Sequence, residues 1–243
     1  MPELIFTVTA GRTGTMYLSE LMADHPRVCS AHEAPPAFNE VMRDVQSHPG
    51  EARRFWVERK LPAIERVCGA KPVYFEASHV FCEGFFEPLV ELGYKPSLIL
   101  LSRPWREIAL SRWRRGDIPG RSPAGLEYLL HPGDPVLFPL ADWGKYTNYQ
   151  LCFWHVLEIY CRQVEYAKVV ADYGGHVAAI TLEQLCNPFW FAKMQSDIGL
   201  DPYTIEHFNQ KLNAWDKNLD QIPEAIEDQE EAICRAFLEV CGV

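Results

Sequence analysis

One segment near the N-terminus constrains the fold more than any other. Leu4–Thr9 (LIFTVT) is a short apolar run rich in β-branched residues, which predicts a buried strand. A glycine-punctuated loop, Ala10–Thr15 (AGRTGT), follows it. The next segment, Met16–Asp24, has its apolar residues spaced as in a helix that packs back on the strand. Strand, glycine loop and helix in this order form the opening unit of a nucleotide-binding α/β sheet.

Strands and helices alternate along the rest of the chain. Further strands are predicted at Arg27–Ser30, Val73–Ala77, Ser97–Ser102 and Val177–Thr181. Helices are predicted at Phe38–Cys68 with a break near Pro49, Glu83–Leu92, Trp105–Arg115 with Pro104 at its first position, Tyr149–Asp172, Leu182–Leu185, Pro188–Ile198, and in the acidic tail from Ile205. This alternation predicts an α/β fold around a mainly parallel sheet.

Between these elements, Ile118–Trp143 carries five prolines and predicts a long irregular loop. Loops of this length in compact domains usually serve a function. The chain shows no internal repeat and no linker, so we expect one domain over residues 1–243.

Composition excludes several classes of protein. The 243 residues are 48% hydrophobic, which is enough for a sizeable core and excludes a disordered chain. A net charge of −10 argues against a general nucleic-acid binder. The eight cysteines form no C-x-x-C pair, and no apolar run approaches the roughly 20 residues that span a membrane. We therefore expect a soluble, cytoplasmic protein with reduced thiols and no membrane span.

The glycine loop has the composition of an anion-binding site. Gly11 and Gly14 allow sharp turns and close approach of the backbone to a ligand. The N–H groups of the first helical turn face the same place, and the helix dipole favours an anion there. Arg12 adds a positive charge, and Thr13 and Thr15 add hydroxyl groups. These features predict a cradle for a phosphate or a sulfate.

Two common nucleotide motifs are absent from this loop. No lysine follows Gly14, so it is not a Walker A loop, and the spacing does not match G-x-G-x-x-G. The alternative is an ordinary strand-to-helix connection in which glycine and threonine serve as turn and cap residues.

A second strand-to-helix unit repeats the pattern. Arg103 follows the strand Ser97–Ser102, at the edge where open α/β sheets bind ligands, and Ser111 comes eight residues later in the helix. Residues 103–121 hold six arginines against two acidic residues, which predicts a local anion site in an acidic chain. A solvated basic helix face is the alternative, and it is favoured for Arg112, Arg114 and Arg115.

Together the two units resemble a known family. The run Gly11-Arg12-Thr13-Gly14-Thr15, with Arg103 and Ser111, is similar to the two nucleotide signatures of sulfotransferases that use 3′-phosphoadenosine 5′-phosphosulfate (PAPS). The resemblance implies that the loop, including Met16, holds the 5′-phosphosulfate, and that Arg103 and Ser111 hold the 3′-phosphate. It also implies a three-layer α/β/α fold of the P-loop nucleotide-kinase type.

Two further segments support the resemblance, and some positions depart from it. Residues 21–36 and 177–200 are similar to the family's post-loop segment and to its late strand–helix segment. Gly11 stands where many members have proline, and Met16 where many have serine or threonine, so one hydroxyl contact is lost. The glycine-rich motif that lies near the adenine in cytosolic members is not recognisable.

The resemblance implies transfer of a sulfuryl group from PAPS to a hydroxyl or amine, leaving 3′,5′-bisphosphoadenosine, with no metal. Arg12 would stabilise negative charge during the transfer. Glu33 is the first candidate for the general base, provided that burial raises its pKa toward neutral. His79, which follows the strand Val73–Ala77, and His32 are the other two candidates.

The acceptor is expected to be a small molecule or a carbohydrate. Four residues of the long loop are expected to shape its pocket: Tyr128, His131, Phe138 and Trp143. Two other functions remain open, an ATP-dependent phosphotransferase and a non-catalytic module that binds nucleotides or sulfate esters. The sequence does not indicate an oligomeric state.

Overall fold

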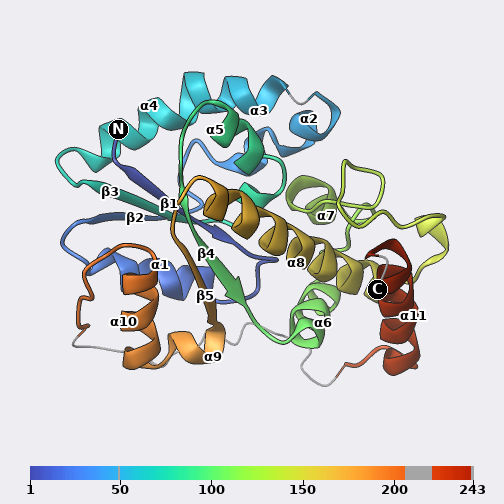
Figure 1. The fold of residues 1–243 in the computed structure, drawn as a ribbon. Coiled ribbons are helices and arrows are strands. Elements are labelled where there is room, and N and C mark those ends of the chain that lie inside the picture. Colours follow the sequence, from blue (N-terminus) through green and yellow to red (C-terminus); the bar gives the residue numbers. More distant parts are fainter. Residues whose placement is uncertain (49, 206–220, 242–243) are drawn as a thin grey trace.

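The computed structural model describes residues 1–48, 50–205 and 221–241. Within these residues, one sheet contains the strands β1 (Glu3–Val8), β2 (Val28–His32), β3 (Val73–Ala77), β4 (Ser97–Ser102) and β5 (Val177–Thr181). The strand order is β2-β3-β1-β4-β5, and every neighbouring pair is parallel (Figure 1). The prediction of an α/β fold with a parallel central sheet is confirmed.

Helices cover both faces of this sheet. They are α1 (Thr15–Ala23), α2 (Met42–Ser47), α3 (Gly50–Phe55), α4 (Leu61–Cys68), α5 (Phe86–Glu91), α6 (Trp105–Arg115), α7 (Pro123–Tyr128), α8 (Asn148–Asp172), α9 (Leu182–Leu185), α10 (Pro188–Asp197) and α11 (Ile226–Cys241). Helices α1 and α10 pack on one face, and α3, α4, α5 and α8 pack on the other. The result is the three-layer α/β/α arrangement expected for a P-loop nucleotide-kinase type of fold.

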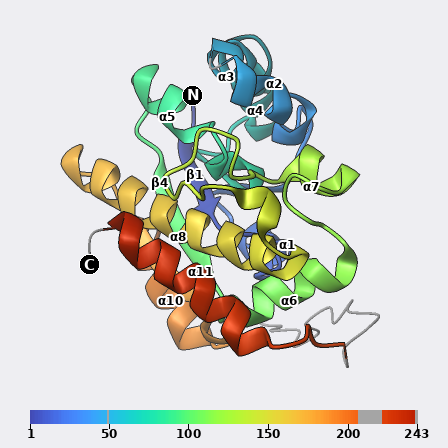
Figure 2. The same ribbon diagram turned by 90° about the vertical axis from the view of Figure 1, so that its right-hand side faces the viewer.

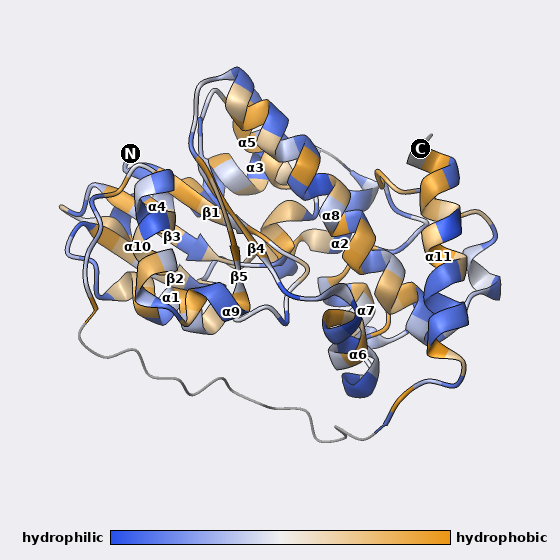
Figure 3. Cartoon of the chain, turned by 60° about the horizontal axis from the view of Figure 1, so that its bottom comes forward, coloured by the Kyte–Doolittle hydropathy of each residue, from blue (hydrophilic) through white to orange (hydrophobic). Residues whose placement is uncertain are grey.

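Successive side chains of the central strand β1 point to opposite faces of the sheet, and each face packs into its own hydrophobic core. Ile5 of β1 packs in the cluster that contains Leu18 of α1, whereas the next residue, Phe6, packs in the cluster on the other face. Phe6 stacks on Phe81 with ring centroids 4.3 Å apart and meets Trp56 edge-on. A strand that is apolar on both faces must be covered twice, and the hydropathy of the ribbon shows this at the centre of the molecule (Figure 3).

Three local predictions differ from the structure. The segment Ile118–Trp143 is not wholly irregular, because it contains α7, whose N-cap Ser122 accepts a hydrogen bond from Gly125 N. The helix expected at Glu83–Leu92 begins only at Phe86, after a single 3₁₀ turn at Val80–Cys82. Pro104 is the N-cap of α6 rather than its first helical residue.

The acidic C-terminal helix α11 packs on α8 (Figure 2), and ion pairs connect it to α6. Tyr149 Oη donates a 2.5 Å hydrogen bond to Glu230, and Arg106 pairs with the same carboxylate at 2.6 Å. The predicted helical tail is therefore present over Ile226–Cys241, while residues 206–220 lie outside the described residues. None of the helices in the described part of the chain is long and apolar enough to cross a membrane.

Candidate functional site

The site forms where the carboxyl ends of the parallel strands meet. The glycine loop follows β1, Glu33 follows β2, His79 follows β3 and Arg103 follows β4. Strands β2 and β3 lie on one side of β1 in the sheet, and strands β4 and β5 lie on the other side. Ligands of open α/β sheets bind outside the strand ends at the point where the direction of winding changes. The four predicted segments thus converge at the edge where a ligand is expected.

Backbone conformation explains the glycines of the loop. Gly11 has φ 72° and Gly14, the N-cap of α1, has φ 90°, a region that residues with side chains rarely adopt. Space is also limited at Gly14, because a Cβ there would lie 2.5 Å from Cδ1 of Leu182. Arg12, between them, also adopts a positive φ of 57°. The loop is therefore tightly wound and delivers the N–H groups of α1 to the strand edge.

The side chains of Thr13, Thr15 and Met16 have different surroundings. Thr13 is buried, and its hydroxyl lies 2.6 Å from that of Thr9, so it braces the loop from within. The Thr15 hydroxyl lies 3.0 Å from Nε2 of His32. Met16 is exposed in the first turn of α1. Of the two threonine hydroxyls, only that of Thr15 lies near a candidate base.

Arg12 connects the two predicted anion signatures. Its Nε donates a 3.0 Å hydrogen bond to Oγ of Ser111, which is buried in α6. Arg103 Nη1 donates to the Arg12 carbonyl oxygen at 3.5 Å, and its Nε donates to Glu107 at 2.5 Å. The structure thus brings Arg12, Arg103 and Ser111 together. Arg103 reaches toward the glycine loop.

A further arginine, Arg112, was expected on a solvated helix face, and that expectation is wrong. Its side chain is 3% exposed, and its Nη2 donates to the carbonyl oxygen of Ala10 beneath the loop. Burial lowers its pKa below the usual value, although the Glu83 carboxylate opposes this shift. Its Nε has no hydrogen-bond partner among the described residues. A second guanidinium therefore supports the loop from below.

The sequence contained a signal for this position. The buried residues of α6 include Ile108, Ala109 and Arg112, which recur at the spacing of one helical face. An arginine on the apolar face of an amphipathic helix is buried with the rest of that face and needs a partner.

The two leading candidates for the general base contact each other. Nδ1 of His79 lies 2.8 Å from Oε1 of Glu33. Burial alone would raise the pKa of Glu33, but the hydrogen bond and charge of His79, with smaller effects of His32 and Arg112, hold it below the usual value. The rise in pKa expected for Glu33 therefore does not occur. An ionised carboxylate only accepts hydrogen bonds, so Nδ1 of His79 is the donor.

The third candidate, His32, lies on the loop side of this pair. Burial lowers its pKa, so the ring is neutral near pH 7, and its Nε2 is engaged with the Thr15 hydroxyl. His32 thus connects the end of β2 to the first turn of α1.

Of the four residues expected to shape an acceptor pocket, one lies beside the Glu33–His79 pair. The ring centroid of Tyr128 in α7 is 6.4 Å from that of His79. Phe138 is fully buried in the core, and His131 packs against Trp143 with centroids 5.5 Å apart. Tyr128 is half-buried and is the member of this set that can contact an acceptor at His79.

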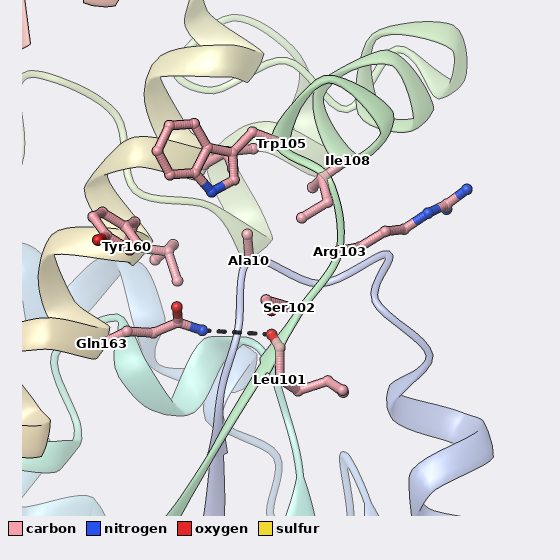
Figure 4. A pocket seen from close by; sticks show the side chains of 10 residues that line it. Ala10, Leu101, Ser102, Arg103, Trp105, Ile108, Tyr160 and Gln163 are labelled. Carbon is pink, nitrogen blue, oxygen red and sulfur yellow. Dashed lines mark hydrogen bonds between the residues drawn. The ribbon is translucent and has the colours of Figure 1, made fainter. Parts of the chain in front are cut away.

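A small pocket lies behind the ends of β1 and β4, between α6 and α8 (Figure 4). Its lining includes Ala10, Ser102, Arg103, Trp105, Tyr160 and Gln163. The rings of Trp105 and Tyr160 have centroids 5.2 Å apart, and Arg103 points in the opposite direction, toward the glycine loop. The cavity measures about 20 Å³, which is room for a water molecule and not for a nucleoside.

No group of three or more His, Cys, Asp or Glu side chains in the described ranges could hold a metal ion. Neither a scan against protein-family models nor a search of curated proteins found a match for this chain. The case for a function therefore depends on the geometry of the loop, its arginines and the Glu33–His79 pair.

Proposed function

We propose that this protein is a sulfotransferase that moves a sulfuryl group from PAPS to a hydroxyl or amine of a small-molecule or carbohydrate acceptor. One observation carries the proposal. Arg12, Arg103 and Arg112 meet at a single glycine loop, and the Glu33–His79 pair lies at the same strand edge. Cations at a helix N-terminus suit a phosphosulfate, and an oriented imidazole suits an acceptor with a proton to lose.

The donor set fits a ligand with two anionic groups. The backbone N–H groups at the start of α1, with Arg12, form one binding site for an anion. Arg103 offers a second cation one residue beyond β4, and its guanidinium is joined to the loop by the Arg12 carbonyl. A nucleotide with phosphates at both the 3′ and the 5′ positions can engage both cations, whereas AMP can engage only one.

The chemistry divides between the loop and the base. The bound donor supplies a sulfuryl group: its S–O bond to phosphate breaks as the acceptor oxygen bonds to sulfur, and the leaving phosphate takes the electron pair. Arg12 and the α1 N-terminus stabilise the charge that develops on the leaving oxygens. Nε2 of His79 takes the acceptor proton, while Glu33 fixes the ring at Nδ1 and stabilises the imidazolium that forms.

This assignment makes His79 the base and Glu33 its orienting partner. A carboxyl whose pKa is held low is a weak proton acceptor near pH 7, whereas histidine is the side chain that most often acts as a general base. Tyr128 beside His79 adds a ring face against which an apolar or carbohydrate acceptor can lie.

Binding measurements test the nucleotide part of the proposal. Isothermal titration calorimetry should show that 3′,5′-bisphosphoadenosine binds at least about 10-fold more tightly than AMP, since a second charge-assisted hydrogen bond contributes about 1.5–3 kcal/mol. Equal affinities would contradict the two-anion site.

Transfer of labelled sulfate from PAPS to a panel of phenols, sugars and amines tests the reaction. Labelled product with the wild type, and its loss in His79→Asn, is the expected result. Bisphosphate binding without any labelled product would favour a non-catalytic binding module. Magnesium-dependent ATP turnover would favour a phosphotransferase.

A further inference from the structure

A buried ion pair lies directly behind the segment that carries Glu33. Nζ of Lys60 is 2.9 Å from Oε1 and 2.8 Å from Oε2 of Glu76, and the two side chains are 1% and 0% exposed. Tyr74 Oη donates a 2.6 Å hydrogen bond to the same carboxylate. Removing two charges from water costs free energy that their attraction often fails to recover. Stability alone therefore does not account for the pair.

The contacts of the pair converge on the residues that follow Glu33. Lys60 Nζ donates to the carbonyl oxygen of Ala34 at 2.8 Å and to that of Pro36 at 3.0 Å. The Ala34 N–H donates to Oε1 of Glu76 at 3.1 Å. Three hydrogen bonds with two buried side chains, two donated by Lys60 and one accepted by Glu76, thus fix the backbone of residues 34–36.

The local sequence places both charges where they are needed. Lys60 ends a π-helical segment, Trp56–Lys60, inserted between α3 and α4. Such insertions shift the helical register and are frequent at functional sites. Glu76 is the one charged residue of β3, a strand that is buried throughout. The Lys60 ammonium also lies 4.7 Å from the ring centroid of Phe38.

Glu33 itself needs external support. Its φ of 45° lies in the left-handed region, which is unfavourable for a residue with a side chain and persists only where the surroundings impose it. On one side the Glu33 N–H donates to the Ala77 carbonyl oxygen at 3.3 Å. On the other side the buried pair holds Ala34.

We propose that Lys60 and Glu76 are a positioning pair that holds Glu33 in this conformation and so keeps its carboxylate on Nδ1 of His79. The inference rests on the proposed function, in which His79 is the base. Neither side chain touches the expected position of a ligand, and both act through the backbone of residues 34–36. Arg12 and Arg103 lie on other strand ends, so nucleotide binding is independent of the pair.

The test uses the full chain carrying the double substitution Lys60→Met and Glu76→Gln. It removes both charges together and avoids leaving one buried charge without a partner. The matched control is Arg162→Met with Glu158→Gln, which removes another buried ion pair, with a separation of 2.7 Å, that makes no contact with residues 33–36. Both variants are compared with Glu33→Gln.

The primary readout is the side-chain ¹⁵N NMR spectrum of His79, which reports the ring nitrogen that carries the proton. We expect the proton on Nδ1 in the wild type and in the Arg162/Glu158 control. In the Lys60/Glu76 variant the preference for Nδ1 should be lost, as in Glu33→Gln. A proton that stays on Nδ1 in the Lys60/Glu76 variant would overturn the proposal.

Kinetics and hydrogen exchange complete the test. The Lys60/Glu76 variant should bind the bisphosphate as the wild type does and lose at least about 10-fold in kcat, since a mis-set base weakens proton transfer. In the wild type, the Ala34 amide should exchange slowly with solvent. Fast exchange would overturn the proposal even if the variant did not fold. Absence of bisphosphate binding or of transfer in the wild type would refute the proposed function and leave the NMR result standing.

Discussion

Nδ1 of His79 lies 2.8 Å from Oε1 of Glu33, although 46 positions separate the two residues in the chain. Their strands explain the meeting: β2 and β3 are parallel neighbours, and His32 is in register with Ala77. Each strand ends at that level, so the residues that follow leave the sheet at the same edge. A carboxylate and an imidazole thereby form a hydrogen-bonded pair.

The buried guanidinium of Arg112 should matter to stability in a way that its neighbours do not. Arg112→Met leaves the buried Ala10 carbonyl oxygen without the hydrogen bond from this guanidinium, and we expect the free energy of unfolding to fall by about 1–3 kcal/mol. Arg114→Met is the matched control, because the hydrogen bond of that side chain within the described residues goes to the Gln221 carbonyl oxygen at the surface, at 2.9 Å. Its loss should change stability by less than about 0.5 kcal/mol. Urea denaturation measures both, and equal effects would contradict the placement of Arg112.

A pair of glycine substitutions separates backbone strain from steric contact in the loop. Gly14 and Gly93 have nearly equal φ values, 90° and 88°, but a Cβ would collide with Leu182 only at Gly14. Gly93→Ala should destabilise by about 1 kcal/mol from backbone strain. Gly14→Ala should cost slightly more, because the end of the flexible Leu182 side chain has to move aside, and the added substitution Leu182→Ala should recover part of the difference. Thermal denaturation that ranks the two alanine variants equally would count against this geometry.

Arg103 should discriminate between nucleotides. Arg103→Ala should weaken binding of 3′,5′-bisphosphoadenosine about 10- to 100-fold, the effect of one lost charge-assisted hydrogen bond, and leave AMP binding unchanged. Arg115→Ala is the control, since Arg115 pairs with Asp117 at 2.8 Å at the far end of α6. Calorimetric titration of the three proteins decides the matter. Parallel losses for both nucleotides would remove the 3′-phosphate assignment.

Stability should rise with pH below neutrality because of His155. The ring is fully buried, and burial lowers its pKa from the usual value near 6.5, although the hydrogen bond with Glu83 opposes this. A histidine with a lowered pKa stabilises the fold above pH 6.5, and this contribution is lost as the pH falls toward the folded-state pKa. His155→Gln should flatten the dependence of the unfolding free energy on pH below about 6.5. An unchanged slope in urea titrations would contradict the buried neutral ring.

Much of the fold could be predicted because burial on both faces leaves a strong sequence signal. The runs Val73–Ala77 and Ser97–Ser102 are largely apolar, and the structure has strands over the same residues. Helix α7 was missed although Ser122-Pro123 is a good start signal, because the surrounding prolines favoured a loop.

Most residues of the candidate site could be predicted from the sequence, but the contacts between them could not. The loop, Arg103 and the three base candidates stand at strand ends that the pattern locates. The contact of Glu33 with His79 depends on the order of strands in the sheet, which local patterns do not encode. Glu76 carried a signal, since a carboxylate inside a buried strand requires a partner, but nothing in the sequence pointed to Lys60. Its burial depends on the π-helical segment before α4.

The central claim is that two positively charged groups, Arg12 and Arg103, hold one adenosine nucleotide beside the Glu33–His79 pair. A crystal structure of the protein with 3′,5′-bisphosphoadenosine tests it most directly. The account predicts the 5′-phosphate on the N–H groups at the start of α1, the 3′-phosphate at Arg103, and Nε2 of His79 facing the open side of the 5′-phosphate. A bisphosphate bound elsewhere, or one that leaves Arg103 without a phosphate contact, would contradict it.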